Sequence, residues 1–231
     1  MIIGCGKIAS QPDQAGMILS HAEAYKSNLE VKLEVCMDLI PNRAEKVAKE
    51  YNCKVVTEIN EGLRVGKPDI VSVCTPDETH FKITKDILCS KDMPRVIFLE
   101  KPACSNDQEF NDLLVLATEN DVSILVNHSR RFNEHHIQLR ERIRNGDYGV
   151  FFQGFAKYYS GWKHNGIHVV DTLSFLLDDE LKVSRVNNSN PSPYEGDPTL
   201  DLEMHLLNNQ GLVCVNGVDE EHYQIFELDL L

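Results

Sequence analysis

The chain has 231 residues, and its 42% hydrophobic and 26% charged residues are typical of a globular protein with a sizeable core. The net charge of −13 argues against nucleic acid and anionic membrane surfaces as partners, because both attract Lys and Arg. No apolar run is long enough to span a membrane, and no basic-then-apolar stretch precedes Ile2, so we expect neither a membrane span nor a secretion leader. The seven cysteines are odd in number and never in C-x-x-C spacing, so we expect reduced core thiols in a cytoplasmic protein.

The chain opens on a predicted buried strand, Ile2–Ile3, that runs into the turn Gly4-Cys5-Gly6-Lys7-Ile8-Ala9. This Gly-x-Gly-x-x-Ala pattern is typical of a turn that binds the pyrophosphate of a dinucleotide. The first glycine allows the tight turn, the second lets backbone N–H groups approach the phosphates, and the small sixth residue lets the next helix pack closely. Taken alone, the pattern fits an ordinary glycine turn equally well.

Strands and helices then alternate over residues 1–127. Pro12 removes a helical hydrogen bond, so we expect a short first turn, a break around Ser10–Asp13 and a helix over Ala15–Tyr25. Further strands are predicted over 31–37, 54–56, 69–74, 96–99 and 122–126, and helices over 41–51, 59–65, 81–90 and 105–120, the last capped by Ser105. This alternation indicates right-handed βαβ units and therefore an α/β fold with a doubly wound parallel Rossmann sheet.

Polar residues follow several of these strands, where ligands bind to sheets of this kind. Asp38 ends its strand, and its carboxylate either binds the hydroxyls of an adenosine ribose and repels a 2′-phosphate or caps the strand end. Because of Asp38 we expect NAD as the cofactor. Arg43 is close enough in sequence to accept a 2′-phosphate, so NADP stays open as the alternative. Thr75-Pro76 and Glu100-Lys101-Pro102 end two later strands. Together with the glycine turn, these residues predict a nucleotide site at one edge of the sheet.

The pattern resembles the Gfo/Idh/MocA family of nicotinamide-dependent oxidoreductases, which act mainly on sugars and their derivatives. The matching stretches are Gly4 to Ala9, Asp38 with Pro41-Asn42-Arg43-Ala44, Cys74-Thr75-Pro76 with His80, Glu100-Lys101-Pro102, Arg130-Arg131-Phe132, and Gly166-Ile167-His168-Val169-Val170-Asp171. The Glu-Lys-Pro stretch is the most specific of them.

The resemblance implies a dinucleotide-binding domain over residues 1–127 and a second α/β domain over 128–231. The second domain would have an open, mainly antiparallel sheet that carries substrate contacts and packs in a homo-oligomer, a dimer or tetramer. The implied cofactor contacts are Gly4, Gly6, Lys7, Ile8, Asp38, Arg43, Cys74, Thr75, Pro76, His80, Glu100 and Lys101. His168 matches the active-site histidine of the family.

Oxidation of a secondary alcohol needs a group that takes the hydroxyl proton, and histidine titrates near neutrality. We expect His168 as the acid/base, Lys101 as the electrostatic and orienting partner, and His164 as a second polar contact or proton relay. The alternatives are a core histidine at 168 and a surface lysine at 101. Arg131 and Asp171 complete the substrate candidates. Arg131 would bind a carboxylate or phosphate of the substrate, and a structural ion pair with the acidic surface is the alternative. Asp171 would contact substrate hydroxyls, and the alternative is that it holds the backbone or an arginine of its own domain.

In the second domain we expect a helix within 130–144 that begins near Asn133, a strand over 151–159 and a helix over 166–177. Residues 187–199, rich in Asn, Ser and Pro, are predicted to form a surface loop, and 200–207, 211–218 and 223–230 to form antiparallel strands. His128, His135 and His136 lack carboxylate or cysteine partners at ligand spacing, so we expect no metal site.

Three features depart from the family pattern. The first strand has almost no lead-in, the chain stops inside a predicted sheet, and His164 stands where the family often has Asp. We therefore expect a fragment or an unusually small member with an incomplete second domain. The leading hypothesis is an NAD-dependent dehydrogenase of a sugar, polyol or sugar derivative. The alternatives are a non-catalytic nucleotide-binding relative and a subunit that depends on a partner subunit.

Overall fold

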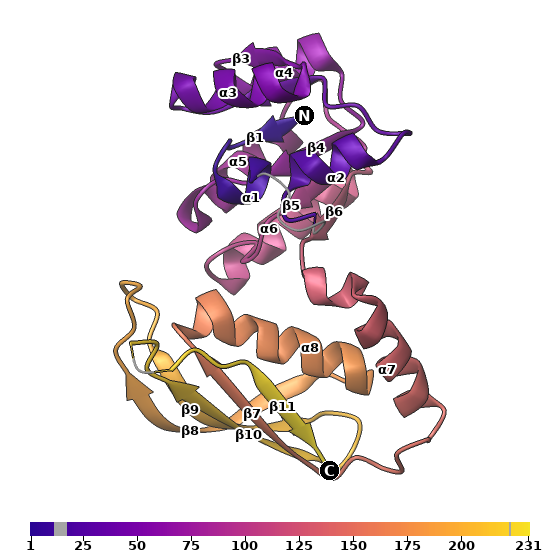
Figure 1. The fold of residues 1–231 in the computed structure, drawn as a ribbon, viewed down its shortest axis with the longest axis vertical. Helices are drawn as coiled ribbons and strands as arrows, with labels where there is room; N and C mark the ends of the chain where they lie inside the picture. Colours follow the sequence, from indigo (N-terminus) through magenta and orange to yellow (C-terminus); the bar gives the residue numbers. More distant parts are fainter. Residues whose placement is uncertain (12–17, 222) are drawn as a thin grey trace. The chain divides into compact units, whose positions relative to one another are not determined.

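The computed structural model describes residues 1–11, 18–221 and 223–231, which form two compact units, Met1–Asn127 and His128–Leu231. In the first unit, the six described strands form one parallel sheet in the order β3-β2-β1-β4-β5-β6 (Figure 1). Their bounds are β1 Ile2–Ile3, β2 Val35–Met37, β3 Lys54–Val56, β4 Ile70–Val73, β5 Val96–Leu99 and β6 Ser123–Val126. This is the strand order of a doubly wound Rossmann sheet, so the predicted fold class is confirmed.

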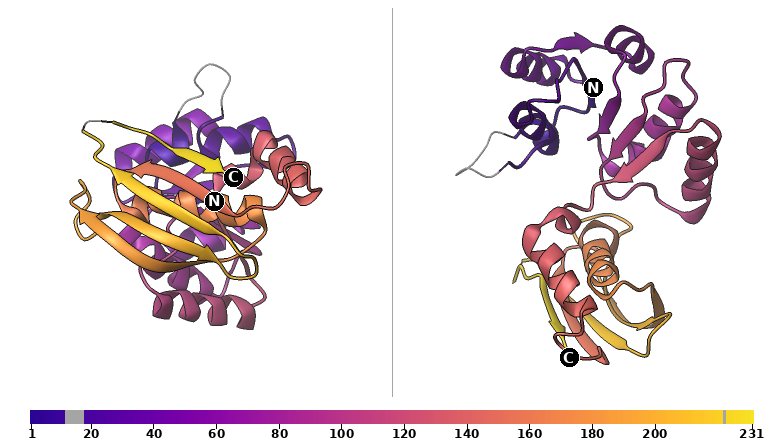
Figure 2. Two further views of the ribbon diagram at one scale, coloured as in Figure 1. Left: turned by 90° about the horizontal axis from the view of Figure 1, so that it is seen from below. Right: turned by 90° about the vertical axis from the view of Figure 1, so that its right-hand side faces the viewer.

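Helices cover both faces of this sheet (Figure 2). They are α1 Lys7–Ser10, α2 His21–Ser27, α3 Pro41–Tyr51, α4 Ile59–Gly66, η1 Asp77–Thr79, α5 His80–Leu88 and α6 Asp107–Glu119. Neighbouring residues of a strand point to opposite faces. Ile2 and Cys36 therefore pack with Ala9 and Val47 of α1 and α3, whereas Ile3 packs in the other core with residues of α4, α5 and α6. Burial on both faces explains why every residue of β1 and β2 is apolar.

The first helix differs from the prediction in its start. Residues 18–20 are not helical, and α2 begins at His21 because the Ser20 hydroxyl accepts a hydrogen bond from the Glu23 N–H at 3.4 Å. The short first turn is α1, which ends at Ser10. The expected break at Pro12 and Asp13 and the expected start at Ala15 fall on residues outside those described.

Two further boundaries also correct the sequence prediction. The cap of α6 is Asn106, not Ser105, because the Asn106 side chain accepts the Glu109 N–H at 3.0 Å. Strand β2 is shorter than 31–37, because only its last three residues pair with β3. Leu33, just before it, is nevertheless buried in the core.

The second unit contains one mixed sheet in the order β11-β7-β10-β9-β8 among its described strands. These are β7 Gln153–Tyr159, β8 Leu181–Asn190, β9 Thr199–Leu206, β10 Leu212–Val218 and β11 Glu227–Leu230. The helical elements are η2 Ser129–Phe132, α7 Glu134–Arg144, the π-helical turn η3 Trp162–Gly166 and α8 Ile167–Leu177. Helix α8 lies along one face of the sheet (Figure 1), where Val169 and Leu173 pack against Ala156 and Val215.

Two expectations for this sheet were wrong. Residues 187–190 belong to strand β8 and not to a loop, because Asn188 and Ser189 pair with Asp201 and Leu200 of β9. On an exposed edge strand, backbone pairing can order residues whose own propensity favours turns. In addition, β10 pairs with β7 in parallel, so the three last strands are not all antiparallel to their neighbours.

All seven cysteines are free thiols, but they do not all lie in the core as expected. Cys5, Cys36 and Cys74 are buried, Cys89 is exposed, and the other three are half-buried. None of the described helices is both long enough and apolar enough to cross a bilayer.

A tyrosine links two strands of the second unit that are not neighbours. Tyr158 of β7 is fully buried, and its hydroxyl accepts the Leu200 N–H at 2.6 Å and donates to the Leu200 carbonyl at 3.1 Å. Gly217 of β10 stands beside Tyr158 in register. A Cβ at Gly217 would lie 3.1 Å from the same carbonyl, so the glycine leaves room for this contact.

We expect Tyr158→Phe to lower the free energy of unfolding by about 1–3 kcal/mol, because it leaves the half-buried N–H and carbonyl of Leu200 without their partner. Urea unfolding followed by circular dichroism measures this loss. Tyr148→Phe, at a tyrosine that is 55% exposed, is the matched control and should stay close to wild type. Equal stability of both variants would show that the Leu200 contacts contribute nothing.

Candidate functional site

The glycine turn after β1 needs its first glycine for steric reasons. Gly4 has a φ of +86°, and a Cβ there would lie 2.7 Å from the Cys74 carbonyl oxygen at the end of β4. Only glycine adopts this conformation readily and permits so close an approach of two strand ends. Ala9 is fully buried, as expected for the small sixth residue.

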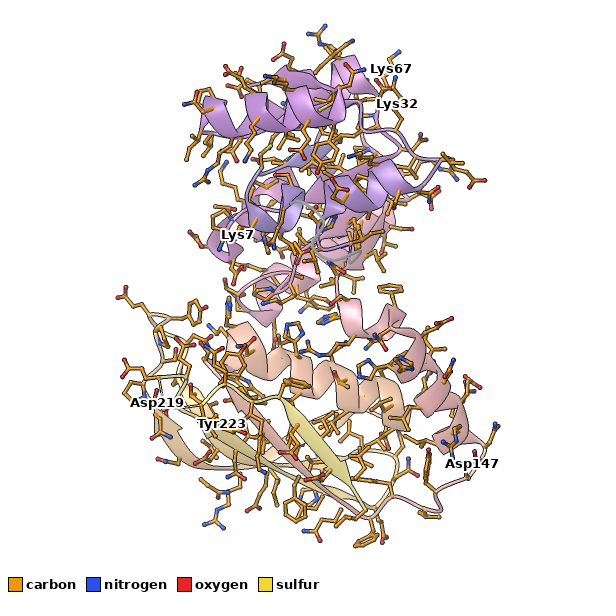
Figure 3. All side chains as sticks on the ribbon, in the orientation of Figure 1. Lys7, Lys32, Lys67, Asp147, Asp219 and Tyr223 are labelled. Atoms are coloured by element: carbon orange, nitrogen blue, oxygen red, sulfur yellow. The ribbon has the colours of Figure 1, made fainter. Side chains whose placement is uncertain are left out.

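The second glycine has a different environment. A Cβ at Gly6 would meet no atom of the described residues within 4 Å. Lys7 and Ile8, which follow it, are exposed, and Figure 3 labels Lys7 near the start of α1. At Gly6, therefore, the backbone of the turn faces space that no described side chain fills.

Asp38 ties this turn to the end of β2. Its Oδ2 accepts the Cys5 N–H at 2.7 Å, and its Oδ1 accepts the Ile40 N–H at 2.7 Å. The carboxylate thus has the structural role that the sequence left open, and it also lines the cleft described next. Each carboxylate oxygen has a second lone pair available to a ligand.

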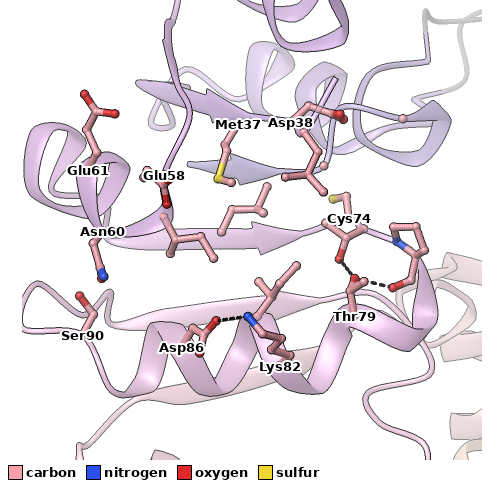
Figure 4. Close-up of a pocket in the computed structure, with 18 of the residues that line it drawn as sticks. Met37, Asp38, Glu58, Asn60, Glu61, Cys74, Thr79, Lys82, Asp86 and Ser90 are labelled. Atoms are coloured by element: carbon pink, nitrogen blue, oxygen red, sulfur yellow. Dashed lines mark hydrogen bonds and ion pairs between the residues drawn. The ribbon is translucent and has the colours of Figure 1, made fainter. Parts of the chain in front are cut away.

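A cleft of about 1460 Å³ lies at this edge of the first unit (Figure 4). Of the twelve predicted cofactor residues, all within the described chain, nine line it: Gly4, Gly6, Lys7, Ile8, Asp38, Arg43, Cys74, Thr75 and Pro76. Residues from the ends of β1, β2 and β4 therefore meet in one concave surface. This is where ligands bind to open parallel sheets.

Several lining residues of the cleft were missed by the sequence analysis. Helix α5 contributes Lys82 and Asp86, paired at 3.1 Å, and Thr79 lies 2.7 Å from both Thr75 Oγ1 and the Pro76 carbonyl (Figure 4). These side chains carry no motif, so only the fold brings them to the site. Burial, and then the charge of Glu100, raises the pKa of the Cys74 thiol, which keeps this thiol neutral in the cleft.

His80, Glu100 and Lys101 do not line the cleft, although all three were predicted to contact the cofactor. His80 is fully buried, with Nδ1 2.6 Å from the Pro102 carbonyl and Nε2 2.8 Å from the Thr75 carbonyl. His80 thus joins the turn after β4 to the turn after β5.

Glu100 is 9% exposed and precedes the half-buried Lys101 at the end of β5. Its Oε1 lies 2.7 Å from His21 Nε2 and accepts the Asn127 side-chain amide at 2.6 Å. Burial raises the pKa of this carboxyl, but the hydrogen bonds from His21 and Asn127 outweigh it, so the pKa lies below its usual value. Glu100 is therefore an ionised, fixed residue of the interior.

In the second unit, His164 lies in η3 and His168 in the first turn of α8, and both are half-buried. The buried carboxylate of Asp197 accepts the N–H groups of Lys163 and His164 at 2.7 and 2.9 Å. The His164 ring stacks on Tyr194 with centroids 4.0 Å apart. The segment that contains Tyr194 and Asp197 thus fixes His164, which the sequence analysis missed.

Asp171 and Arg131 form an ion pair. Arg131 Nε donates to Asp171 Oδ1 at 2.7 Å, and His128 Nδ1 lies 3.6 Å from the same oxygen. Burial lowers the pKa of the neighbouring Arg130, whose guanidinium lies 4.2 Å from the Phe226 ring centroid. The structural alternative considered for Asp171, that it holds an arginine of its own domain, fits this geometry.

The predicted site residues are therefore divided between the two units. Arg131, His164, His168 and Asp171 belong to the second unit, and the others to the first. Within the described residues, no cluster of three or more His, Cys, Asp or Glu side chains forms a metal site.

Residues 1–128 match the model of the GFO_IDH_MocA family, described as an oxidoreductase family with an NAD-binding Rossmann fold. The chain belongs to this family. The inositol 2-dehydrogenase of Rhizobium meliloti is 29% identical over 129 residues, which cover 56% of this chain and 38% of the relative. The D-glucoside 3-dehydrogenase of Escherichia coli is 26% identical over 157 residues, which cover 68% of this chain and 42% of the relative. Both matches thus span less than half of the relative's length.

Solved structures of similar fold cover more of this Gfo/Idh/MocA member than the two sequence matches do. A putative myo-inositol dehydrogenase from Sinorhizobium meliloti has a TM-score of 0.78 at 19% identity over 99% of this chain and 71% of its own. A 3-ketoreductase from Actinomadura kijaniata in complex with NADP has a TM-score of 0.82 at 14% identity over 99% of this chain and 71% of its own. At these identities the likeness concerns the fold.

For the glycine turn of this family member, we expect Gly4→Ala to lower the free energy of unfolding by about 1–3 kcal/mol. The new Cβ would meet the Cys74 carbonyl, and the positive φ adds backbone strain. Gly6→Ala is the matched control and should unfold like wild type, because its Cβ enters open space. Urea unfolding of both variants measures the difference, and equal stability would contradict this account of the turn.

We also expect a pH-dependent effect of Asn127→Leu, which removes one hydrogen bond to the ionised Glu100. The lowered pKa of Glu100 stabilises the fold above the ordinary carboxyl pKa of about 4.5, and this contribution is lost as the pH falls through the folded-state value. At pH 7 the variant should be less stable by about 1.5–3 kcal/mol. This difference in unfolding free energy between the variant and wild type should shrink below about pH 4.5. Urea unfolding curves recorded between pH 3.5 and 7 measure it, and a difference that stays constant over this range would refute the account.

Proposed function

We propose that this chain binds a nicotinamide dinucleotide in the cleft beside the glycine turn and serves a dehydrogenase that oxidises a secondary alcohol of a sugar, polyol or sugar derivative. The observation that carries the proposal is the meeting of Gly6, Asp38 and Thr75 in one cleft at the carboxyl edge of a Rossmann sheet. The inositol and glucoside dehydrogenases among the relatives support the substrate class.

The geometry of the turn fits a dinucleotide. The backbone at Gly6 faces open space, so N–H groups of the turn can approach a pyrophosphate without a Cβ between them. The ends of β2 and β4 provide Asp38 for the ribose and Thr75 and Pro76 for the middle of the cofactor.

We expect NAD in preference to NADP. The hydrogen bonds from Cys5 and Ile40 hold the Asp38 carboxylate at the cleft, where its negative charge opposes a 2′-phosphate. Arg43 is exposed and also lines the cleft, so its guanidinium is the group through which NADP would bind.

In the reaction that we propose, a nicotinamide dinucleotide held beside Gly6, Asp38 and Thr75 would supply the hydride acceptor for the oxidation of the alcohol to a carbonyl. His168 takes the hydroxyl proton, and the ammonium of Lys101 stabilises the negative charge that develops on the oxygen. His164, fixed by Tyr194 and Asp197, provides a further polar contact to the substrate or relays the proton. We assign Arg131 and Asp171 to the substrate side of the site, acting as the ion pair that they form.

We further propose a homo-oligomer, a dimer or tetramer, that packs through the open sheet of the second unit. Phe155 of β7 is 39% exposed, whereas the next residue, Ala156, points to the α8 side and is buried. The seven free thiols favour a reducing compartment, and we propose the cytoplasm.

Calorimetric titration with NADH and NADPH tests the cofactor. We expect the wild-type chain to bind NADH in the micromolar range and more tightly than NADPH. Gly6→Ala should weaken NADH binding without loss of stability, because its Cβ would enter the space assigned to the pyrophosphate. Asp38→Ala should reduce the preference for NADH. A protein that binds neither dinucleotide would refute the proposed function.

Turnover tests the chemistry once binding is established, with myo-inositol and methyl glucosides as the first substrates and NADH absorbance as the readout. His168→Ala should lower kcat by about 10²–10⁴-fold, and Lys101→Met should also lower it strongly. Wild-type rates in both variants would refute their roles. Tight cofactor binding without turnover on any sugar would favour the alternative of a non-catalytic relative or of a chain that depends on a partner subunit.

A further inference from the structure

One carboxylate oxygen joins three segments of the first unit that are far apart in sequence. Glu100 Oε1 at the end of β5 lies 2.7 Å from His21 Nε2 at the start of α2 and 2.6 Å from the Asn127 amide after β6. His21 and Glu100 are 79 residues apart. Glu100 belongs to the Glu-Lys-Pro motif, whereas His21 belongs to none of the motifs.

His21 is 5% exposed and has one polar partner among the described residues. Its Nδ1 is buried without a hydrogen bond, and its ring packs edge-on against Phe98 at 4.8 Å and Tyr25 at 6.3 Å. Burying an imidazole costs free energy unless its polar atoms are bonded. The Nε2 contact to Glu100 is therefore what offsets the burial of this side chain, and it fixes the ring in one orientation.

The same contact bears on Lys101, because Lys101 lies between two anchored residues. On one side, the Glu100 N–H donates to the Val73 carbonyl at 3.0 Å, and its side chain is held by His21. On the other side, the Pro102 carbonyl lies 2.6 Å from His80 Nδ1. The direction in which the Lys101 side chain leaves the backbone thus depends on the Glu100 side chain being held.

We propose that His21 is a positioning residue for the nicotinamide half of the dinucleotide site. Through Glu100 it holds the turn that carries Lys101, and among the described residues its side chain hydrogen-bonds to Glu100 and not to the pyrophosphate turn. This inference rests on the proposed function, since it presumes that Lys101 contacts the nicotinamide end of a bound dinucleotide. The other half of the ligand, the adenosine and pyrophosphate, binds to residues that His21 does not hold.

Comparing the binding of two ligands, one with and one without the nicotinamide ring, distinguishes a positioning role of His21 from a general structural role. NADH contains both halves, whereas ADP-ribose lacks the nicotinamide ring. We expect His21→Leu to weaken NADH binding by about tenfold, the effect of a lost polar interaction, and to leave ADP-ribose binding within about twofold of wild type. His21→Gln, whose amide can reach Glu100, should restore most of the NADH affinity.

Tyr25→Phe is the matched control. Tyr25 lies in the same helix and bonds through its hydroxyl to Ser72, so the variant loses a hydrogen bond of α2 without touching Glu100. It should bind NADH like wild type. Circular dichroism checks that each variant is folded. If His21→Leu does not fold, the shorter His21→Asn replaces it and is compared with His21→Gln.

The outcomes distinguish this inference from the proposed function. If wild type binds neither NADH nor ADP-ribose, the proposed function fails and the inference fails with it. If wild type binds both, but His21→Leu or its replacement loses both equally or retains both fully, only the inference is overturned. A loss confined to NADH that His21→Gln reverses supports it.

Discussion

The hydrogen bond from the Cys5 N–H to the Asp38 carboxylate determines how the nucleotide-binding edge of the first unit is built. Parallel strands pair along their length, but the turns that follow them have no ladder partner. Asp38 supplies that partner for the glycine turn, while Gly4 allows the same turn to approach the end of β4. The open cleft depends on both residues. The Asp38 side chain bridges the ends of β1 and β2. The lack of a side chain at Gly4 lets the end of β4 come close.

A similar division of roles applies at the end of β5. Glu100 was expected to contact the cofactor, yet its side chain faces inward and bonds to His21 and Asn127. Lys101 follows directly in the chain. Glu100 is thus the buried, fixed residue, and the adjacent Lys101 is the residue to which we assign a role in the reaction. In the second unit, Asp197 plays the corresponding part for His164, since it holds the backbone from which that ring projects.

Local signals were sufficient to predict part of this fold from the sequence. Proline at the first position of α3 and continuous apolar residues in β5 gave the observed bounds of both elements. Predictions failed where pairing overrode propensity, as in the polar residues of β8, and where a cap lay one residue from the expected one, as at Asn106. The motifs indicated the lining of the cleft from β1, β2 and β4. They gave no sign of His21 or Tyr194, because long-range contacts of single side chains leave no local pattern in the chain.

Asn127 is the last residue of the first unit and the point where the chain crosses into the second. Its N–H donates to the Leu99 carbonyl at 2.8 Å, and its amide donates to Glu100. The chain therefore leaves the first unit directly from a residue that is hydrogen-bonded to Leu99 and Glu100, at the carboxyl end of β5. The residue at which the chain leaves the first unit is thus also a hydrogen-bond partner of the carboxylate that precedes Lys101.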